Sequence, residues 1–179
     1  MQKSMVFQHI YCLFCRSGSE RQLARELEIR FPHICAIAAM QEKHKYINGR
    51  YEIDRRSFLP GYLFLYTNEE IDVLSIHRMD KAYKVLGDGH ELAELCGRDR
   101  IFAEWIWKNG GEIGISRLRI KEDGFEVVSG PLQHFLKEIV KIDKHTRNAL
   151  VRMDFLEEQR EIWLAFEFED DGEKNGEVK

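Results

Sequence analysis

The sequence contains no long hydrophobic run. No apolar stretch approaches the roughly 18 residues that a membrane-spanning helix requires, so we expect no membrane partner. The first residues show only a short apolar segment and no cleavage-like site of small residues, and we expect no signal peptide. The 179 residues have a high charged fraction, which predicts a soluble cytoplasmic protein with one ordinary domain or two small ones.

Cysteine is also scarce. The four cysteines are Cys12, Cys15, Cys35 and Cys96, and their scatter predicts free thiols in a reducing cytoplasm rather than a disulfide framework. Cys12 and Cys15 have a CxxC spacing, but no second pair accompanies them, and metal knuckles place their thiolates in a turn. On a strand, residues three apart point to opposite faces. We therefore favour two packed thiols over a zinc or redox site.

The familiar signatures of catalytic sites are missing. The segment that begins at His90-Glu91 lacks the second histidine of a zincin helix, and the seven histidines show no ligand spacing. No glycine-rich phosphate loop occurs, and no serine or cysteine lies in a nucleophile-elbow context. We expect neither an enzyme nor a bound cofactor or metal. The alternative, an enzyme with a cryptic site, requires a deep polar pocket with perturbed titratable groups.

The most informative feature that is present is a strand with one aromatic face. Residues 55–66 read RRSFLPGYLFLY, a basic approach and a Pro-Gly followed by alternating side chains. On a pleated strand, Tyr62, Phe64 and Tyr66 share one face, and the two leucines share the other. The second face of a half-buried strand is normally polar, so an aromatic one needs a partner or a cover. This pattern favours a docking surface over a catalytic cleft.

The first 110 residues predict the order strand, helix, strand, strand, helix, strand, with a further helix over 98–108. That order is typical of a split βαβ domain (ferredoxin-like or RNP-like), with helices on one face of the sheet and the other face open. Such an open face with aromatic side chains commonly meets nucleic acid or a partner helix. Residues 42–54 are predicted to form a long hairpin loop. Ser17 and Glu20 have capping-box spacing, and Asn68 is predicted to cap the second helix.

Beyond about residue 111 the pattern changes to short strands separated by turns. Strands are predicted over 125–129, 138–143, 149–155 and 161–168, which suggests a small SH3-like β-barrel. The predicted fold class is therefore α+β, a split βαβ domain followed by that barrel. The predicted boundaries are 1–110 for the first domain, 111–123 for a linker or leading strand, 124–169 for the barrel and 170–179 for a disordered acidic tail.

Charge is distributed unevenly along the chain. Residues 1–110 carry 16 Lys and Arg against 15 Asp and Glu, whereas residues 111–179 carry 11 against 16, a balance of −5. This asymmetry suggests two surfaces with different partners. From charge alone, a solvated hairpin loop is the simpler interpretation of the basic cluster in the first part. The cluster consists of Lys43, Lys45, Arg50, Arg55 and Arg56.

Four segments resemble the NusG family of transcription elongation factors. YCLFCRSGSE at 11–20 and FLPGYLF at 58–64 resemble its N-terminal domain, while SGPL at 129–132 and IVKIDKHTRNA at 139–149 resemble its C-terminal KOW barrel. The Gly-Pro-Leu turn with KIDKH is most similar to the LoaP branch, whose members act as processive antiterminators on chosen operons. The last hairpin has Glu157-Glu158 where the family often has glycine, so we expect a reshaped turn there.

The resemblance implies that the open face docks on the clamp helices of RNA polymerase and promotes processive transcription. The matching residues are Phe14, Leu59, Pro60, Tyr62 and Phe64. It also implies contacts with a nascent RNA hairpin or with non-template DNA at Arg16 and Arg78, to which the basic cluster would add phosphate contacts.

The resemblance further implies a second protein partner at the barrel, and we expect a monomer. A rival interpretation is a stand-alone RNA-binding module that stacks bases on Tyr62 and Phe64.

Overall fold

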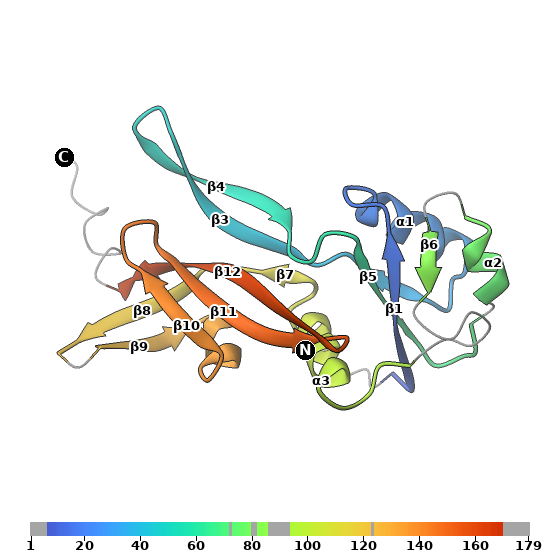
Figure 1. Cartoon of the computed structure of the whole chain (residues 1–179). Coiled ribbons are helices and arrows are strands. Elements are labelled where there is room, and N and C mark those ends of the chain that lie inside the picture. The colour runs from blue at the N-terminus through green and yellow to red at the C-terminus, as the bar shows by residue number, and fades with distance from the viewer. Residues whose placement is uncertain (1–6, 72, 80–81, 86–93, 123, 170–179) are drawn as a thin grey trace, which may run out of the picture. The chain divides into compact units, whose positions relative to one another are not determined.

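The chain, drawn in Figure 1, forms two compact units. The first unit is interrupted in sequence by residues 41–56, a β-hairpin that belongs to the second unit. The first unit comprises Met1–Met40 and Ser57–Glu112, and the second comprises Gln41–Arg56 and Ile113–Lys179. The fold is mixed α+β, with mostly strands, few helices and several sheets. The computed structural model describes residues 7–71, 73–79, 82–85, 94–122 and 124–169.

An antiparallel sheet of four strands forms the centre of the first unit. Its strand order is β2-β5-β1-β6. The register of the central pair places Phe14 opposite Tyr62 and Ile10 opposite Tyr66. The four strands lie close to the four that the sequence predicts. Their bounds are His9–Cys15 for β1, Cys35–Ile37 for β2, Tyr62–Thr67 for β5 and Ala82–Val85 for β6.

Helices α1 (Glu20–Arg30) and α2 (Val73–His77) cover one face of this sheet. The apolar stripe of α1 meets the leucines of β5, and Ile76 of α2 joins the same core. Burying each such side chain contributes on the order of 2 kcal/mol to folding. The fully buried members are Leu13, Leu23, Leu27, Leu63, Leu65 and Ile76.

Helix α3 (Gly97–Lys108) covers part of the opposite face, so the prediction of an open face is wrong over that part. The ring of Phe64 lies 6.1 Å from that of Phe102 in α3, centroid to centroid. The hydroxyl of Tyr66 donates a hydrogen bond of 2.8 Å to the carbonyl of Ala103. The third helix has an apolar side that needs a surface, and the aromatic face of β5 provides it.

Both predicted helix caps are wrong. Ser19 is the N-cap of α1 and makes no side-chain cap hydrogen bond. Glu20 is therefore the first helical residue, and its carboxylate binds elsewhere, as described below. Asn68 lies well before α2, which begins at Val73, and its Oδ1 instead accepts a hydrogen bond of 2.8 Å from the backbone N–H of Gln8.

The predicted long loop over 42–54 is also wrong, because these residues form a regular β-hairpin. Strands β3 (Met40–Ile47) and β4 (Arg50–Ser57) are joined by Asn48-Gly49, and with β7 (Glu112–Ile113) they make a sheet in the order β4-β3-β7. Both turn residues have positive φ, 51° and 82°. Asn-Gly is the pair that two-residue hairpin turns favour, since both positions need the left-handed region.

Five strands of the second unit form one curled, barrel-like sheet in the order β10-β11-β12-β8-β9. Neighbouring strands are antiparallel except β12 and β8, which run parallel with Phe166 opposite Ser116. The inward-facing side chains form a core that includes Leu118, Leu132, Val151, Phe155 and Phe166, all fully buried. The bounds are Ser116–Lys121 for β8, Gly124–Ser129 for β9, Ile139–Asp143 for β10, Asn148–Phe155 for β11 and Glu158–Phe168 for β12, with a 3-10 helix at Pro131–Phe135.

Two turns of this unit contain residues with positive φ, one with glycine and one without. Gly130 has a φ of 93°, and a Cβ there would lie 2.6 Å from the Cα of Ser116, so only glycine fits. The two-residue β11–β12 turn contains no glycine, and its residues Leu156 and Glu157 have φ of 54° and 62°; that it is reshaped relative to the family stays a prediction. Each such residue costs about 1 kcal/mol in strain.

Among the described residues, no helix has the length and the apolarity needed to cross a membrane.

Candidate functional site

The exposed end of the aromatic face carries a pair of rings on the two central strands. Phe14 of β1 and Tyr62 of β5 lie opposite each other, with ring centroids 5.3 Å apart and planes at 66°. Phe14 is 40% exposed, Tyr62 is half-buried, and Pro60 in the preceding turn is exposed. We call Phe14, Pro60 and Tyr62 the ring patch.

Two of the five residues predicted to bind a partner do not reach the surface. Phe64 is 0% exposed because Phe102 of α3 lies against it. Leu59 is 5% exposed, and its carbonyl accepts the N–H of Tyr62 in a turn that presents Pro60 outward instead. Neither side chain can contact a partner in this conformation. The structure therefore reduces the predicted surface to the three residues of the ring patch.

A buried carboxylate holds the loops around the ring patch. Glu20 is only 4% exposed. Its Oε1 accepts the backbone N–H of Gly61 at 2.6 Å, and its Oε2 accepts the N–H of Gly18 at 2.8 Å. A buried carboxylate needs such donors to compensate for lost hydration. This role of Glu20 is not predictable from the sequence, because Gly61 lies 41 residues away along the chain.

Gly61 itself is restricted by its surroundings. Its φ is 86°, and a Cβ would lie 3.2 Å from both the carbonyl oxygen of Cys15 and the ring of Phe14. Its carbonyl accepts the N–H of Cys15 at 2.8 Å. The Pro-Gly pair thus brings the β5 turn against the end of β1, and this close approach positions Pro60 and Tyr62 beside Phe14.

The two arginines predicted to contact nucleic acid come from different parts of the first unit. Arg16 directly follows β1, two residues after Phe14, and is exposed. Arg78 follows α2 and is also exposed. Helix α2 packs on the leucine face of the sheet, opposite the face with the ring patch. Of the two arginines, therefore, Arg16 alone directly follows a strand that carries a residue of the ring patch.

The basic cluster lies on the β3–β4 hairpin of the second unit. Two of its five members are ion-paired within the hairpin: Arg55 with Glu42 at 3.2 Å, and Arg56 with Asp54 at 2.6 Å. Burial, and then the nearby positive charge of Arg56, lower the pKa of Lys43. Within the cluster, Lys43 and Arg56 are therefore close enough to repel each other.

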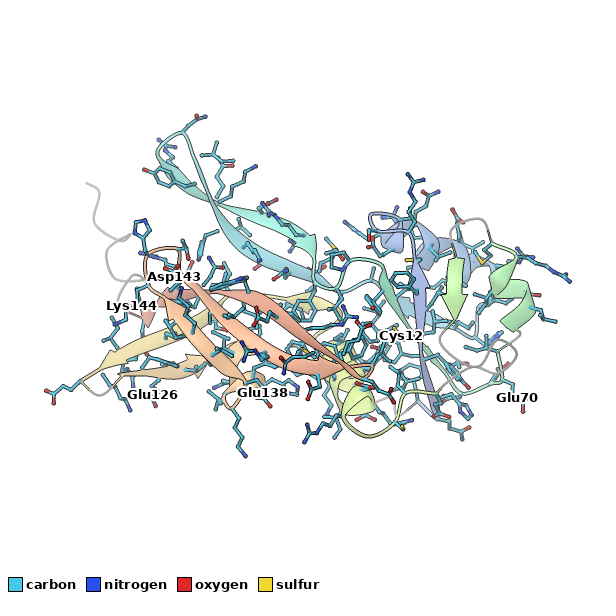
Figure 2. All side chains as sticks on the ribbon, viewed as in Figure 1. Cys12, Glu70, Glu126, Glu138, Asp143 and Lys144 are labelled. Carbon is cyan, nitrogen blue, oxygen red and sulfur yellow. The ribbon has the colours of Figure 1, made fainter. Side chains whose placement is uncertain are left out.

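The two cysteines of the CxxC spacing are both buried, and Figure 2 labels Cys12 on β1. Cys15 belongs to the leucine-rich core, while Cys12 lies opposite Phe64 in the register, on the other face. Burial, with a smaller contribution from Glu20, raises the pKa of Cys15 to about 11. The thiols therefore lie on opposite faces of the sheet, as the strand spacing predicts.

Within the described part of the chain, no group of three or more His, Cys, Asp or Glu residues could hold a metal ion. An open surface depression of about 200 Å³ lies between α1 and β2 and is lined by Arg21, Arg25 and Glu28 together with alanines, Ile37 and Gly110. Glu28 accepts the N–H of Ala36 at 3.1 Å, so it helps to join the helix to the strand. In the comparison with known proteins, no protein-family model and no curated protein matches this chain.

Proposed function

We propose that this chain is a transcription elongation factor of the NusG type, which binds the clamp helices of RNA polymerase through the ring patch. The observation that carries the proposal is the pair of Phe14, which is exposed, and Tyr62, which is half-buried, beside the exposed Pro60. These residues belong to the two segments that resemble the N-terminal domain of that family. Aromatic anchors that are partly exposed and rigidly held are typical of the few residues that dominate a protein interface.

Topology supports the proposal. The order β2-β5-β1-β6 of the four-stranded sheet, with α1 and α2 between strands, is compatible with a split βαβ domain. The barrel-like sheet of the second unit is compatible with the proposed SH3-like KOW barrel. A fold alone does not establish a function, so the proposal depends on the ring patch.

The mechanism follows from preferential binding. A factor that grips the polymerase clamp in its closed conformation shifts the clamp toward that state, because a ligand favours the conformation that it binds better. A closed clamp disfavours pausing, so processivity and antitermination increase. The β3–β4 hairpin and Arg16 would add contacts with nascent RNA or non-template DNA, and the barrel would bind a second protein.

The rival function, a stand-alone RNA-binding module, is less well supported. It requires bases to stack on Tyr62 and Phe64, but Phe64 is covered by α3. A platform with only Phe14 and Tyr62 remains, and Phe14 is edge-on to Tyr62 rather than coplanar with it. An interdigitating apolar helix tip fits such a surface better than flat bases do.

The direct test is a pull-down of bacterial RNA polymerase with the full chain from nuclease-treated lysate. We expect the polymerase to be retained, because the proposed contact is between proteins. If polymerase is retained from untreated lysate but not from nuclease-treated lysate, the contact runs through nucleic acid and the rival function is favoured.

A second assay measures elongation through a terminator, with and without the protein, on templates that differ in leader sequence. Readthrough on one leader only would indicate a LoaP-like, operon-specific factor, whereas equal readthrough on all leaders would indicate a general one. No readthrough on any template would contradict the antitermination part of the proposal.

A further inference from the structure

The turn between β10 and β11 presents basic side chains on the second unit, outside the basic cluster of the β3–β4 hairpin. Lys141 lies in β10 and Lys144 and His145 lie in the turn, and all three are exposed. Figure 2 shows Asp143 and Lys144 at this end of the two strands. Lys144 forms no ion pair with any residue that the structure describes.

The carboxylates near this turn contact groups other than Lys141 and Lys144 at the distances of hydrogen bonds and ion pairs. Asp143 Oδ1 accepts the backbone N–H groups of His145 and Thr146, both at 3.0 Å, and these bonds lower the pKa of that carboxyl. At the end of β12, Glu167 lies 3.8 Å from Nε2 of His44 in the hairpin, and Glu169 binds Arg119. Asp143 keeps its negative charge and interacts with Lys141, so the two lysines Lys141 and Lys144 outnumber one carboxylate that the backbone of the turn already binds.

The backbone of the turn is anchored to β12. The carbonyl of Arg147 accepts the N–H of Phe166 at 2.9 Å, and the Arg147 guanidinium lies 5.8 Å from the ring centroid of Phe168. Arg147 also has a φ of 53°, which closes the turn tightly. A turn held in this way presents its lysines with less conformational entropy to lose on binding.

We propose that the β10–β11 turn is a binding site for the phosphate backbone of a nucleic acid, with Lys141 and Lys144 as its contacts. Lysines act on phosphates as point charges and read no base sequence, so single-stranded RNA and DNA would share this chemistry. The inference rests on the proposed function, to which it adds a nucleic-acid contact besides the hairpin on the same unit.

The test compares two double variants of the full chain that each remove two exposed lysines. One is Lys141→Ala with Lys144→Ala, and the matched control is Lys108→Ala with Lys137→Ala. Fluorescence anisotropy with one 20-nucleotide sequence, as RNA and as DNA, gives the Kd over a range of salt concentrations. At low salt we expect about tenfold weaker binding for the first variant, and a salt slope smaller by about 0.7 per lost contact. The control should change Kd by less than about twofold.

A third variant gives an effect of opposite sign. Asp143→Asn keeps the Oδ1 acceptor of the turn but removes its negative charge, so binding should tighten. If both double variants lose the same affinity, net charge explains the binding and the proposed site is wrong. The same conclusion follows if the unmodified protein binds neither probe.

Polymerase pull-down with the same proteins separates this inference from the proposed function. The lysine variants should retain polymerase as the unmodified chain does, because the ring patch lies in the other unit. If the unmodified chain binds the nucleic-acid probes but retains no polymerase, the proposed function is contradicted and this site is left standing. A higher affinity for the RNA probe would identify the nascent transcript as the source of the phosphates, and a higher affinity for DNA would identify the displaced strand.

Discussion

The two ends of the aromatic face on β5 carry similar side chains but have different surroundings. At one end, Phe64 and Tyr66 are fully buried beneath α3. At the other end, Tyr62 lies beside Phe14 near the surface. The alternation of the strand is the same along its whole length. The two ends therefore differ in whether helix α3 covers them, and the comparison predicts different consequences for substitutions two residues apart.

The largest effect should come from the covered end. Phe64→Ala leaves a cavity under Phe102, and we expect the free energy of unfolding to fall by about 3–5 kcal/mol. Tyr62→Ala removes a half-buried ring and should cost well under half of that. Urea denaturation, followed by tryptophan fluorescence, measures both. Equal losses for the two variants would mean that α3 does not distinguish the ends.

The next effect concerns the carboxylate that holds the exposed end in place. Glu20→Gln retains one acceptor oxygen but presents an amide N–H₂ group to the other backbone donor. A buried donor without an acceptor costs about 1–3 kcal/mol, so the free energy of unfolding should fall by that amount. Glu26→Gln is the matched control on the same helix, because its remaining oxygen can still accept from Gln22. A change of less than about 0.5 kcal/mol for Glu20→Gln would contradict the role assigned to this carboxylate.

The smallest effect concerns two hairpin turns that both have positive φ but differ in their residues. The β3–β4 turn has Asn48-Gly49, while the β11–β12 turn has Leu156-Glu157 in the same left-handed region. Glu157→Gly should therefore stabilise the second unit by about 0.5–1 kcal/mol, measured as a raised midpoint of thermal unfolding. The control Gly130→Ala should lower the midpoint, since its Cβ would meet Ser116. A lower midpoint for Glu157→Gly would show that the turn is not strained.

Much of the fold could be predicted from the sequence, because it depends on local patterns. The period-2 alternation of β5 and the 3.6-residue stripe of α1 are properties of the segments themselves. The β3–β4 hairpin was predictable as well, since Asn48-Gly49 between alternating residues is a strong hairpin signal, but the polar composition of the segment hid it.

The cover over Phe64 was not predictable in the same way. Both faces of β5 are apolar, and the pattern does not say which helix packs on which face. The role of Glu20 depends on the N–H of Gly61, 41 residues away, and no local pattern contains that contact. Of the five residues predicted to bind polymerase, Phe14, Pro60 and Tyr62 are not buried in the structure, and their role in binding stays a prediction.

The affinity of purified bacterial RNA polymerase for Tyr62→Ala tests the central claim most directly. The control is Ile29→Ala, because Ile29 is 82% exposed on α1 in the same unit. We expect Tyr62→Ala to weaken binding by at least about 2 kcal/mol, roughly thirtyfold in Kd, while Ile29→Ala leaves Kd unchanged. If Tyr62→Ala binds polymerase as tightly as the unmodified chain does, the ring patch is not the docking surface.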